Sequence, residues 1–223
     1  MCGRFTSLLS PELMEVIFQV KAPQVLAKRY NIAPTQMVPV VRCCENDHNQ
    51  LEEMKWGLIP SWAKEPSIGS HMINARSETV HEKPAFRHAI KYRRCIVPAS
   101  GFFEWSHAGD SKQPYYIRLL DNSPMGLAGI LETCKTPSGD QLESFSILTT
   151  STNSLVSQLH DRMPVILHSD EYALWLNRNM HEPEQLTHLY LPYPADLMTA
   201  IKVSPFVNSP AHDSPECINP LPK

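Results

Sequence analysis

The chain has no apolar run long enough to cross a membrane, and it lacks the segments of a secretory signal. A spanning helix needs roughly 18 consecutive apolar residues, and no stretch approaches that length. The N-terminus has no basic region followed by an apolar core. We therefore expect a cytoplasmic protein with no membrane partner.

Metal-binding and disulfide patterns are also missing. The six cysteines include no C-x-x-C pair, and the adjacent Cys43 and Cys44 are a poor metal template. The ten histidines include no H-E-x-x-H spacing. A disulfide framework is not expected in a cytosolic chain of 223 residues. We predict no metal and no cofactor.

Positive charge is not in excess either. The chain has 20 Lys and Arg residues against 23 Asp and Glu residues, a net charge of −3. This balance argues against a protein that coats duplex DNA through bulk electrostatics. It leaves room for a local groove that contacts a few phosphates, and such a groove would depend on particular arginines.

Twenty prolines and only eight glycines indicate many short, sharply bounded elements. Residues 10–12 have the pattern of a helix N-cap and first turn. The apolar residues Leu13, Val16, Ile17 and Val20 follow at helical spacing, so we expect a helix there.

Apolar and β-branched segments predict the remaining elements. Short strands are expected at 38–41, 95–97 and 165–167, and three consecutive antiparallel strands at 115–120, 126–131 and 145–150. Short helices are expected at 151–160 and 172–176. Strands dominate the middle and helices the periphery, which favours one α+β domain over residues 1–223 with a loop-like tail at 205–223.

The first residues, Met1-Cys2-Gly3-Arg4-Phe5, contain the most informative feature. If Met1 is removed, Cys2 carries a free α-amine and a thiol on adjacent carbons. Such an aminothiol condenses with an aldehyde to an imine, and the sulfur then closes a five-membered thiazolidine. Ordinary pKa values of about 7.7–8.0 for the amine and about 8.5 for the thiol leave both groups partly reactive near neutrality. The terminus alone does not separate this role from a cysteine that stands second by chance.

Two further segments place polar groups in unusual surroundings. Asn74 and Arg76 would share one face of an extended segment, although a polar surface turn would explain them equally well. Glu104 stands between Phe103 and Trp105, where burial would raise its pKa and suit proton transfer. A structural salt bridge, or a position on the wet face of a strand, would also account for Glu104.

Two more segments carry a histidine and exposed aromatic candidates. His160 could act as an acid or base near neutral pH, while its neighbours Asp161 and Arg162 could simply shape a turn. Trp56 has the setting of a core residue, and Trp62 is the better candidate for exposure and stacking on bases.

Taken in order, these segments resemble the SOS response-associated peptidase (SRAP) family, the abasic-site processing proteins. The matching motifs are M-C-G-R-F, Y-N-I-A-P, W-G-L-I-P-S-W, I-N-A-R-S-E-T, G-F-F-E-W and L-H-D-R-M-P, followed by I-K-V-S-P-F-V-N near the end. Each motif is short, but six in sequence behind a second-position cysteine are hard to obtain by accident. The chain departs from the family where Ala63 follows Trp62, since the family pattern has two adjacent tryptophans.

The resemblance implies a fold and an activity. The fold would be an open pseudo-barrel of largely antiparallel sheets with short peripheral helices. The protein would sense abasic sites in single-stranded DNA and form a covalent cross-link through Cys2, which shields the lesion. Lyase-like activity and autocatalytic removal of Met1 are further implications. We expect a monomer, associated with the nucleoid when bound to DNA.

The resemblance also assigns roles to ten residues. Cys2 would be the nucleophile, Asn74 would hold its backbone, Glu104 would relay a proton, and His160 would assist sugar ring opening. The expected DNA-binding residues are Arg4, Pro34, Trp62, Arg76, Thr149 and Arg162, with the arginines on phosphates and Pro34 and Trp62 against bases.

Two rival functions use the same residues. A cysteine peptidase would pair the Cys2 thiolate with His160, oriented by Glu104 or Asn74, and its narrowest form would remove only Met1. A non-catalytic single-stranded DNA module would need Arg4 and Arg76 but not Cys2.

Overall fold

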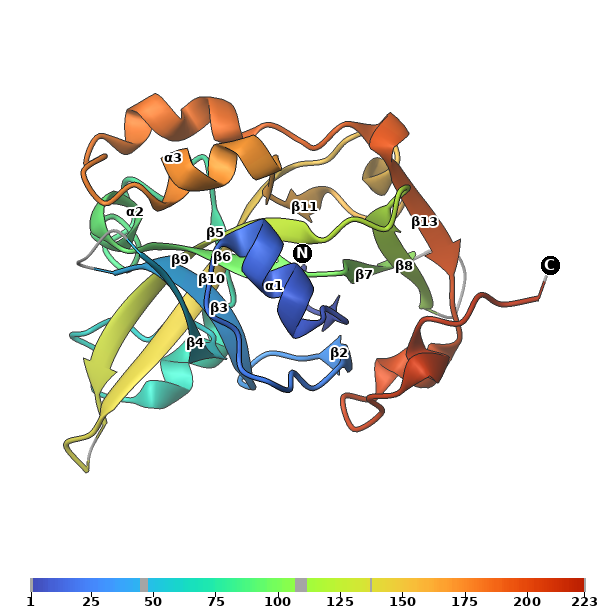
Figure 1. The fold of residues 1–223 in the computed structure, drawn as a ribbon, viewed down its shortest axis with the longest axis horizontal. Coiled ribbons are helices and arrows are strands. Elements are labelled where there is room, and N and C mark those ends of the chain that lie inside the picture. The colour runs from blue at the N-terminus through green and yellow to red at the C-terminus, as the bar shows by residue number, and fades with distance from the viewer. Residues whose placement is uncertain (1, 45–47, 107–111, 137, 223) are drawn as a thin grey trace.

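The computed structural model describes residues 2–44, 48–106, 112–136 and 138–222. Met1, whose removal we predict, lies outside these residues. Two β-sheets and a set of short helices make up the described chain (Figure 1). This arrangement agrees with the predicted α+β class.

A five-stranded sheet holds the N-terminal segment. Its order is β13–β8–β7–β1–β2. The strands are β1 (Phe5–Ser7), β2 (Arg29–Ile32), β7 (Gly101–Ser106), β8 (Gln113–Leu119) and β13 (Met198–Lys202). Because β1 pairs antiparallel with β2 on one side and β7 on the other, the residues just before it are held beside two strands.

The eight-stranded sheet forms a barrel-like ring. Its strands are β3 (Met37–Cys43), β4 (Asn49–Trp56), β5 (Asn74–Arg76), β6 (Arg94–Ala99), β9 (Met125–Lys135), β10 (Gln141–Ser151), β11 (Arg162–Pro164) and β12 (Ile166–Leu167). The pairings run from β10 through β4, β3, β6 and β9 and return to β10, which closes the ring. Strand β10 pairs parallel with β4 and β5, while the other pairings are antiparallel.

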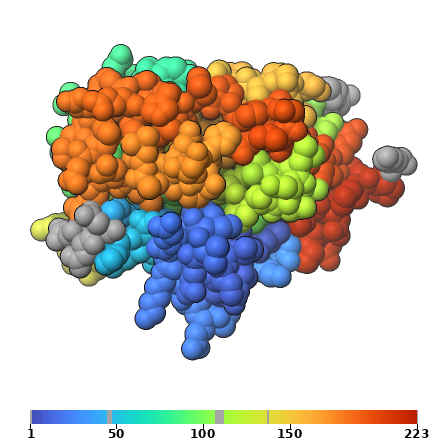
Figure 2. Space-filling view, turned by 45° about the horizontal axis from the view of Figure 1, so that its top comes forward, coloured from blue at the N-terminus to red at the C-terminus, as the bar shows by residue number. Residues whose placement is uncertain are grey.

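Short helices lie outside the sheets. The α-helices are α1 (Pro11–Phe18), α2 (Ala89–Tyr92) and α3 (Tyr172–Leu176). The 3₁₀ helices are η1 (Pro66–His71), η2 (Val156–Gln158), η3 (Ser169–Glu171), η4 (Pro183–Tyr190), η5 (Ala195–Leu197), η6 (Pro205–Asn208) and η7 (Pro215–Cys217). In the space-filling view, the orange segment with α3 lies directly above the blue N-terminal residues (Figure 2).

Buried side chains form three clusters. The first joins the two sheets and contains Cys2, Phe5, Trp56 and Phe102. The second packs the other face of the eight-stranded sheet against the helices, through residues such as Phe18. The third joins the five-stranded sheet to the C-terminal tail. Trp56 is fully buried, which confirms the prediction of a core residue.

Several predicted elements are confirmed, one predicted strand pairing is wrong, and one predicted helix is much too long. The helix at 172–176 and the strands at 38–41, 95–97, 126–131 and 145–150 lie within observed elements. The strand at 115–120 does not pair with the one at 126–131, because β8 belongs to the five-stranded sheet between β7 and β13. The helix predicted at 151–160 is limited to η2. There Asn153 Oδ1 accepts the amides of Leu155 and Val156, which turns the chain locally after β10 ends.

The first helix begins as predicted but ends earlier and faces differently. The Ser10 hydroxyl accepts the amide of Leu13, which caps the helix. Gln19 ends it with φ of 54°, so Val20 lies beyond the helix. Met14 and Phe18 form the buried face, and Val16 is 78% exposed.

The tail after Ser204 is fixed by an internal amide. Asn31 Nδ2 donates to the carbonyls of Val207, Ser209 and His212 at 3.1, 3.0 and 2.6 Å. Cys217 is fully buried in the third cluster. The tail therefore wraps the five-stranded sheet, as the red segment shows beside β2 (Figure 1).

Candidate functional site

Cys2 and Asn74 are in direct contact. The Cys2 side chain is fully buried within the first cluster. Asn74, the first residue of β5, donates from Nδ2 to the main-chain carbonyl of Cys2 at 2.9 Å. The preceding carbonyl, that of Ile73, accepts the indole N–H of Trp56 at 2.9 Å. A core tryptophan thus fixes the strand that holds the terminus.

Glu104 lies on the same side of β7 as Phe102, because alternate residues of a strand share a face. Its neighbour Phe103 faces the third cluster instead. Only 2% of Glu104 is exposed, and this burial raises its pKa to about 7, with the Asp161 charge adding to the increase. Burial likewise raises the pKa of the Cys2 thiol, and the Glu104 charge adds to that increase as well. The carboxyl is therefore close enough to Cys2 to influence it, and it can gain or lose a proton near neutral pH.

His160 lies in the turn between η2 and β11. Its Nδ1 accepts the amide of Arg162 at 3.0 Å and lies 2.7 Å from Asp161 Oδ1. The preceding residue, Leu159, packs against the cluster that contains Cys2, which brings this turn to the same region.

Strand β10 sets the positions of three predicted DNA-binding residues. Thr149 pairs with Arg76 of β5 on one side and with Pro164 of β11 on the other. Arg162 Nη2 donates to the Thr149 carbonyl at 2.6 Å. Its two terminal nitrogens also reach Glu78 Oε1 and Oε2 at 2.5 and 2.8 Å. Sequence reasoning missed Glu78, since its partner lies 84 residues away and leaves no local signal.

An open groove connects Trp62 with Asn74 and Arg76. Its volume is ≈ 360 Å³. The lining residues are mostly apolar, with two cations: Trp62, Met72, Asn74, Arg76, Thr79, Lys83, Pro84, Ala85 and Phe86. Trp62 is 61% exposed, as predicted. An exposed indole beside cationic side chains is a surface on which a base can stack while its phosphates are neutralised.

Arg4 and Pro34 are not among the residues that line this groove. Arg4 Nη1 donates to Asn31 Oδ1 at 2.7 Å and to the Val207 carbonyl at 2.9 Å. Its guanidinium also lies 5.9 Å from the Trp105 ring centre. These contacts tie the N-terminal strand to the tail, so part of Arg4 is occupied within the protein. Pro34 is half-buried in the connection between β2 and β3.

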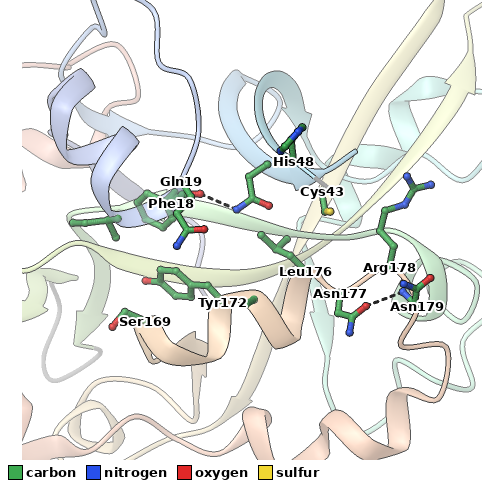
Figure 3. Close-up of a pocket in the computed structure, with 13 residues that line it drawn as sticks. Phe18, Gln19, Cys43, His48, Ser169, Tyr172, Leu176, Asn177, Arg178 and Asn179 are labelled. Atoms are coloured by element: carbon green, nitrogen blue, oxygen red, sulfur yellow. Dashed lines mark hydrogen bonds between the residues drawn. The ribbon is translucent and has the colours of Figure 1, made fainter. Parts of the chain in front are cut away.

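A larger hollow of ≈ 530 Å³ lies elsewhere, between the end of α1 and α3 (Figure 3). Phe18, Tyr172 and Leu176 on its wall belong to the second cluster. None of the ten predicted site residues lines it. The larger of these two hollows is therefore not the one that contains predicted site residues.

Two absences apply to the described ranges, 2–44, 48–106, 112–136 and 138–222. Within them, no group of three His, Cys, Asp or Glu side chains could hold a metal ion. No helix there has the length and apolar character needed to span a bilayer.

Known proteins are similar to this chain in both sequence and fold. The family model for SOS response associated peptidase (SRAP) matches residues 1–210. Abasic site processing protein YoqW of Bacillus subtilis (strain 168) is 42% identical over 224 residues, covering 98% of this chain and 99% of that protein. Abasic site processing protein HMCES of Rattus norvegicus is 32% identical over 240 residues, covering 91% of this chain and 67% of that protein. An X-ray structure from Bacteroides thetaiotaomicron has a TM-score of 0.89 at 29% identity, covering 99% of this chain and 100% of that one.

Proposed function

This chain belongs to the SOS response associated peptidase (SRAP) family, and we propose that it captures abasic sites in single-stranded DNA covalently through Cys2. The names of its relatives support abasic-site processing in general. The observation that carries the proposal is the 2.9 Å contact between Asn74 and Cys2. Asn74 also lines the groove with Trp62 and Arg76, so one residue links the nucleophile to a surface suited to DNA.

The chemistry begins with hydrolytic removal of Met1. The α-amine of Cys2 then adds to the C1′ aldehyde of the open-chain deoxyribose, and loss of one water gives an imine. The Cys2 sulfur adds to the imine carbon while its proton moves to the nitrogen, which closes the thiazolidine. The sum is one C–N bond and one C–S bond formed with release of one water, and no oxidant or reductant is needed.

The surroundings of Cys2 suit this order of steps. Burial raises the thiol pKa, so the thiol stays protonated near neutrality and the amine reacts first. Glu104, with a pKa of about 7, can take a proton from the amine and return it to the departing hydroxyl. His160 would protonate or deprotonate the sugar oxygen during ring opening. Asn74 would keep the terminus from turning away.

The test compares two single-stranded oligonucleotides, one with a natural abasic site and one with a tetrahydrofuran analogue that has no aldehyde. The expected result is a heat-stable adduct with the first oligonucleotide only, lost in Cys2→Ala. Intact mass should equal protein without Met1 plus oligonucleotide minus one water. An adduct that retains Met1 would refute the mechanism.

The rival functions give other outcomes in the same assay. Equal binding of both oligonucleotides with no adduct would favour a non-catalytic DNA module. Cleavage of added peptides with no adduct would favour the peptidase.

A further inference from the structure

Arg162 binds the carboxylate of Glu78, and the charge of Arg76 also acts on that carboxylate. Arg162 binds it through both terminal nitrogens, at 2.5 and 2.8 Å. These bonds, together with the nearby charge of Arg76, hold the pKa of Glu78 below its usual range. An oxyanion held by a two-pronged guanidinium next to a second guanidinium is the arrangement that suits a phosphodiester. A phosphodiester could therefore make the same contacts with Arg162 that the Glu78 carboxylate makes.

The two partners differ in how firmly they are held. The Arg162 side chain is 12% exposed, and it donates a further hydrogen bond to the Thr149 carbonyl at 2.6 Å. The Glu78 side chain is 51% exposed. When a competing anion arrives, the arginine is positioned to stay while the carboxylate can turn into solvent.

We propose that Glu78 is an internal competitor for DNA phosphate. Its carboxylate binds the two terminal nitrogens of Arg162 in the free protein, and a phosphodiester of the bound strand displaces it. This inference rests on single-stranded DNA being the ligand of the proposed function. The pair is open to solvent on the Glu78 side, so this carboxylate can exchange for another anion while Arg162 keeps its place. The competitor lowers affinity for every strand, so intact DNA is released readily while a strand captured at Cys2 stays attached.

The opposite role for Glu78 would be to orient Arg162 for DNA. The two roles predict effects of opposite sign. Removing a competitor strengthens DNA binding, whereas removing an orienting partner weakens it. Glu78→Gln separates the two roles, because the amide keeps the size of the side chain but loses the charge that binds the Arg162 guanidinium.

The experiment measures equilibrium binding of tetrahydrofuran-containing single-stranded DNA by fluorescence anisotropy, which requires no covalent step. We expect Glu78→Gln to bind at least about two- to fivefold more tightly, because the DNA phosphate no longer has to displace a charged partner from Arg162. Glu82→Gln is the matched control. Glu82 is exposed in the same loop, forms no ion pair with any residue that the structure describes, and gives the same change in net charge.

A double-mutant cycle tests whether the effect passes through Arg162. In an Arg162→Ala background, Glu78→Gln should change affinity no more than Glu82→Gln does. Unchanged or weaker binding by Glu78→Gln would overturn the inference, and so would an equal gain with Glu82→Gln. If the unmodified protein binds no single-stranded DNA at all, the proposed function itself fails, which is a distinct result.

Discussion

The side-chain amide of Asn74 and the main-chain carbonyl of Cys2 are joined by a 2.9 Å hydrogen bond across 72 residues of chain. The bond runs from an internal strand to the terminus that precedes β1. The position of the proposed nucleophile is therefore set by β5 as well as by its own strand.

Replacing Asn74 by Asp removes this donor and places a carboxylate against a carbonyl oxygen. Cross-linking to abasic DNA should slow by about tenfold or more, since a hydrogen bond is worth roughly 1 kcal/mol and an unpaired buried group costs more. The new carboxylate also lies in the groove that would bind DNA, so the rate of adduct formation is compared at saturating DNA, where affinity no longer limits it. Asn49→Asp is the control, because Asn49 Nδ2 makes the same kind of bond to the Phe18 carbonyl, also at 2.9 Å, beside the remote hollow. Equal slowing in both variants would contradict a positioning role for Asn74.

Burial of Glu104 should make stability depend on pH. The folded-state pKa of about 7 lies above the ordinary value of 4.5, so the folded protein holds this proton more tightly than the unfolded chain. The stabilisation is complete below about pH 4.5 and is lost as pH rises through 7. Glu104→Gln should therefore raise the free energy of unfolding at pH 8 by on the order of 2 kcal/mol and much less at pH 5.

The same substitution should abolish or strongly slow cross-linking, because Gln cannot accept a proton. Chemical denaturation at both pH values checks the stability effect, with the exposed Glu184→Gln as control. A gain in stability that is equal at pH 5 and pH 8 would rule out titration of Glu104 as the cause.

Trp62 and Trp56 should respond in opposite ways. Trp62→Ala should leave the melting temperature nearly unchanged, since the residue is 61% exposed. Its affinity for single-stranded DNA should fall by the roughly 1–3 kcal/mol that base stacking contributes. Trp56→Ala should instead cost about 3–5 kcal/mol of stability. Undiminished DNA affinity in Trp62→Ala would mean that bases do not stack there.

Arg76 should account for part of the salt dependence of DNA binding. A phosphate contact to single-stranded DNA contributes a slope of about −0.7 in log K against log salt. Arg76→Ala should make the slope shallower by about that amount. Arg178→Ala removes the same charge beside the remote hollow and should leave the slope as it was.

Asn31 should be a stability determinant that joins both ends of the chain. It is fully buried, donates to three tail carbonyls and accepts from Arg4. Asn31→Ala should cost about 3 kcal/mol, because several buried polar groups lose their partner. Limited proteolysis should then cut the tail, whereas the exposed Asn219→Ala should behave like the unmodified protein. A protected tail in Asn31→Ala would show that other contacts suffice.

Local patterns in the sequence were enough to place most elements. The Ser10 cap, the β-branched runs and the helix at 172–176 follow from interactions within a few residues. The wrong strand pairing has a non-local cause, and the helix predicted at 151–160 is shortened by a non-local pairing at its start as well as by the local contacts of Asn153. Nothing near Tyr115 shows that its strand pairs with β7 and β13, and the extended Ser151 is set by pairing with Arg162 of β11.

The features of the candidate site also separate into those that local sequence predicted and those that it did not. Glu104 between two aromatic residues indicated burial, and the structure shows that burial. The partnership of Glu78 with Arg162, and the use of Arg4 to hold the tail, join residues distant in sequence. Such pairs become visible only when the strands that carry them are in register.

Strand β10 adjoins β5 and β11 through alternate residues, pairing Ile147 with Asn74, Thr149 with Arg76 and Ser151 with Arg162. Because successive residues of a strand point to opposite faces, an insertion or deletion of one residue in this stretch would turn the side chains that follow it to the other face. Asn74, Arg76 and Arg162 therefore cannot be repositioned independently by small changes in the backbone. The binding properties of this surface can therefore change only through substitution of its side chains, while the backbone of these strands stays the same.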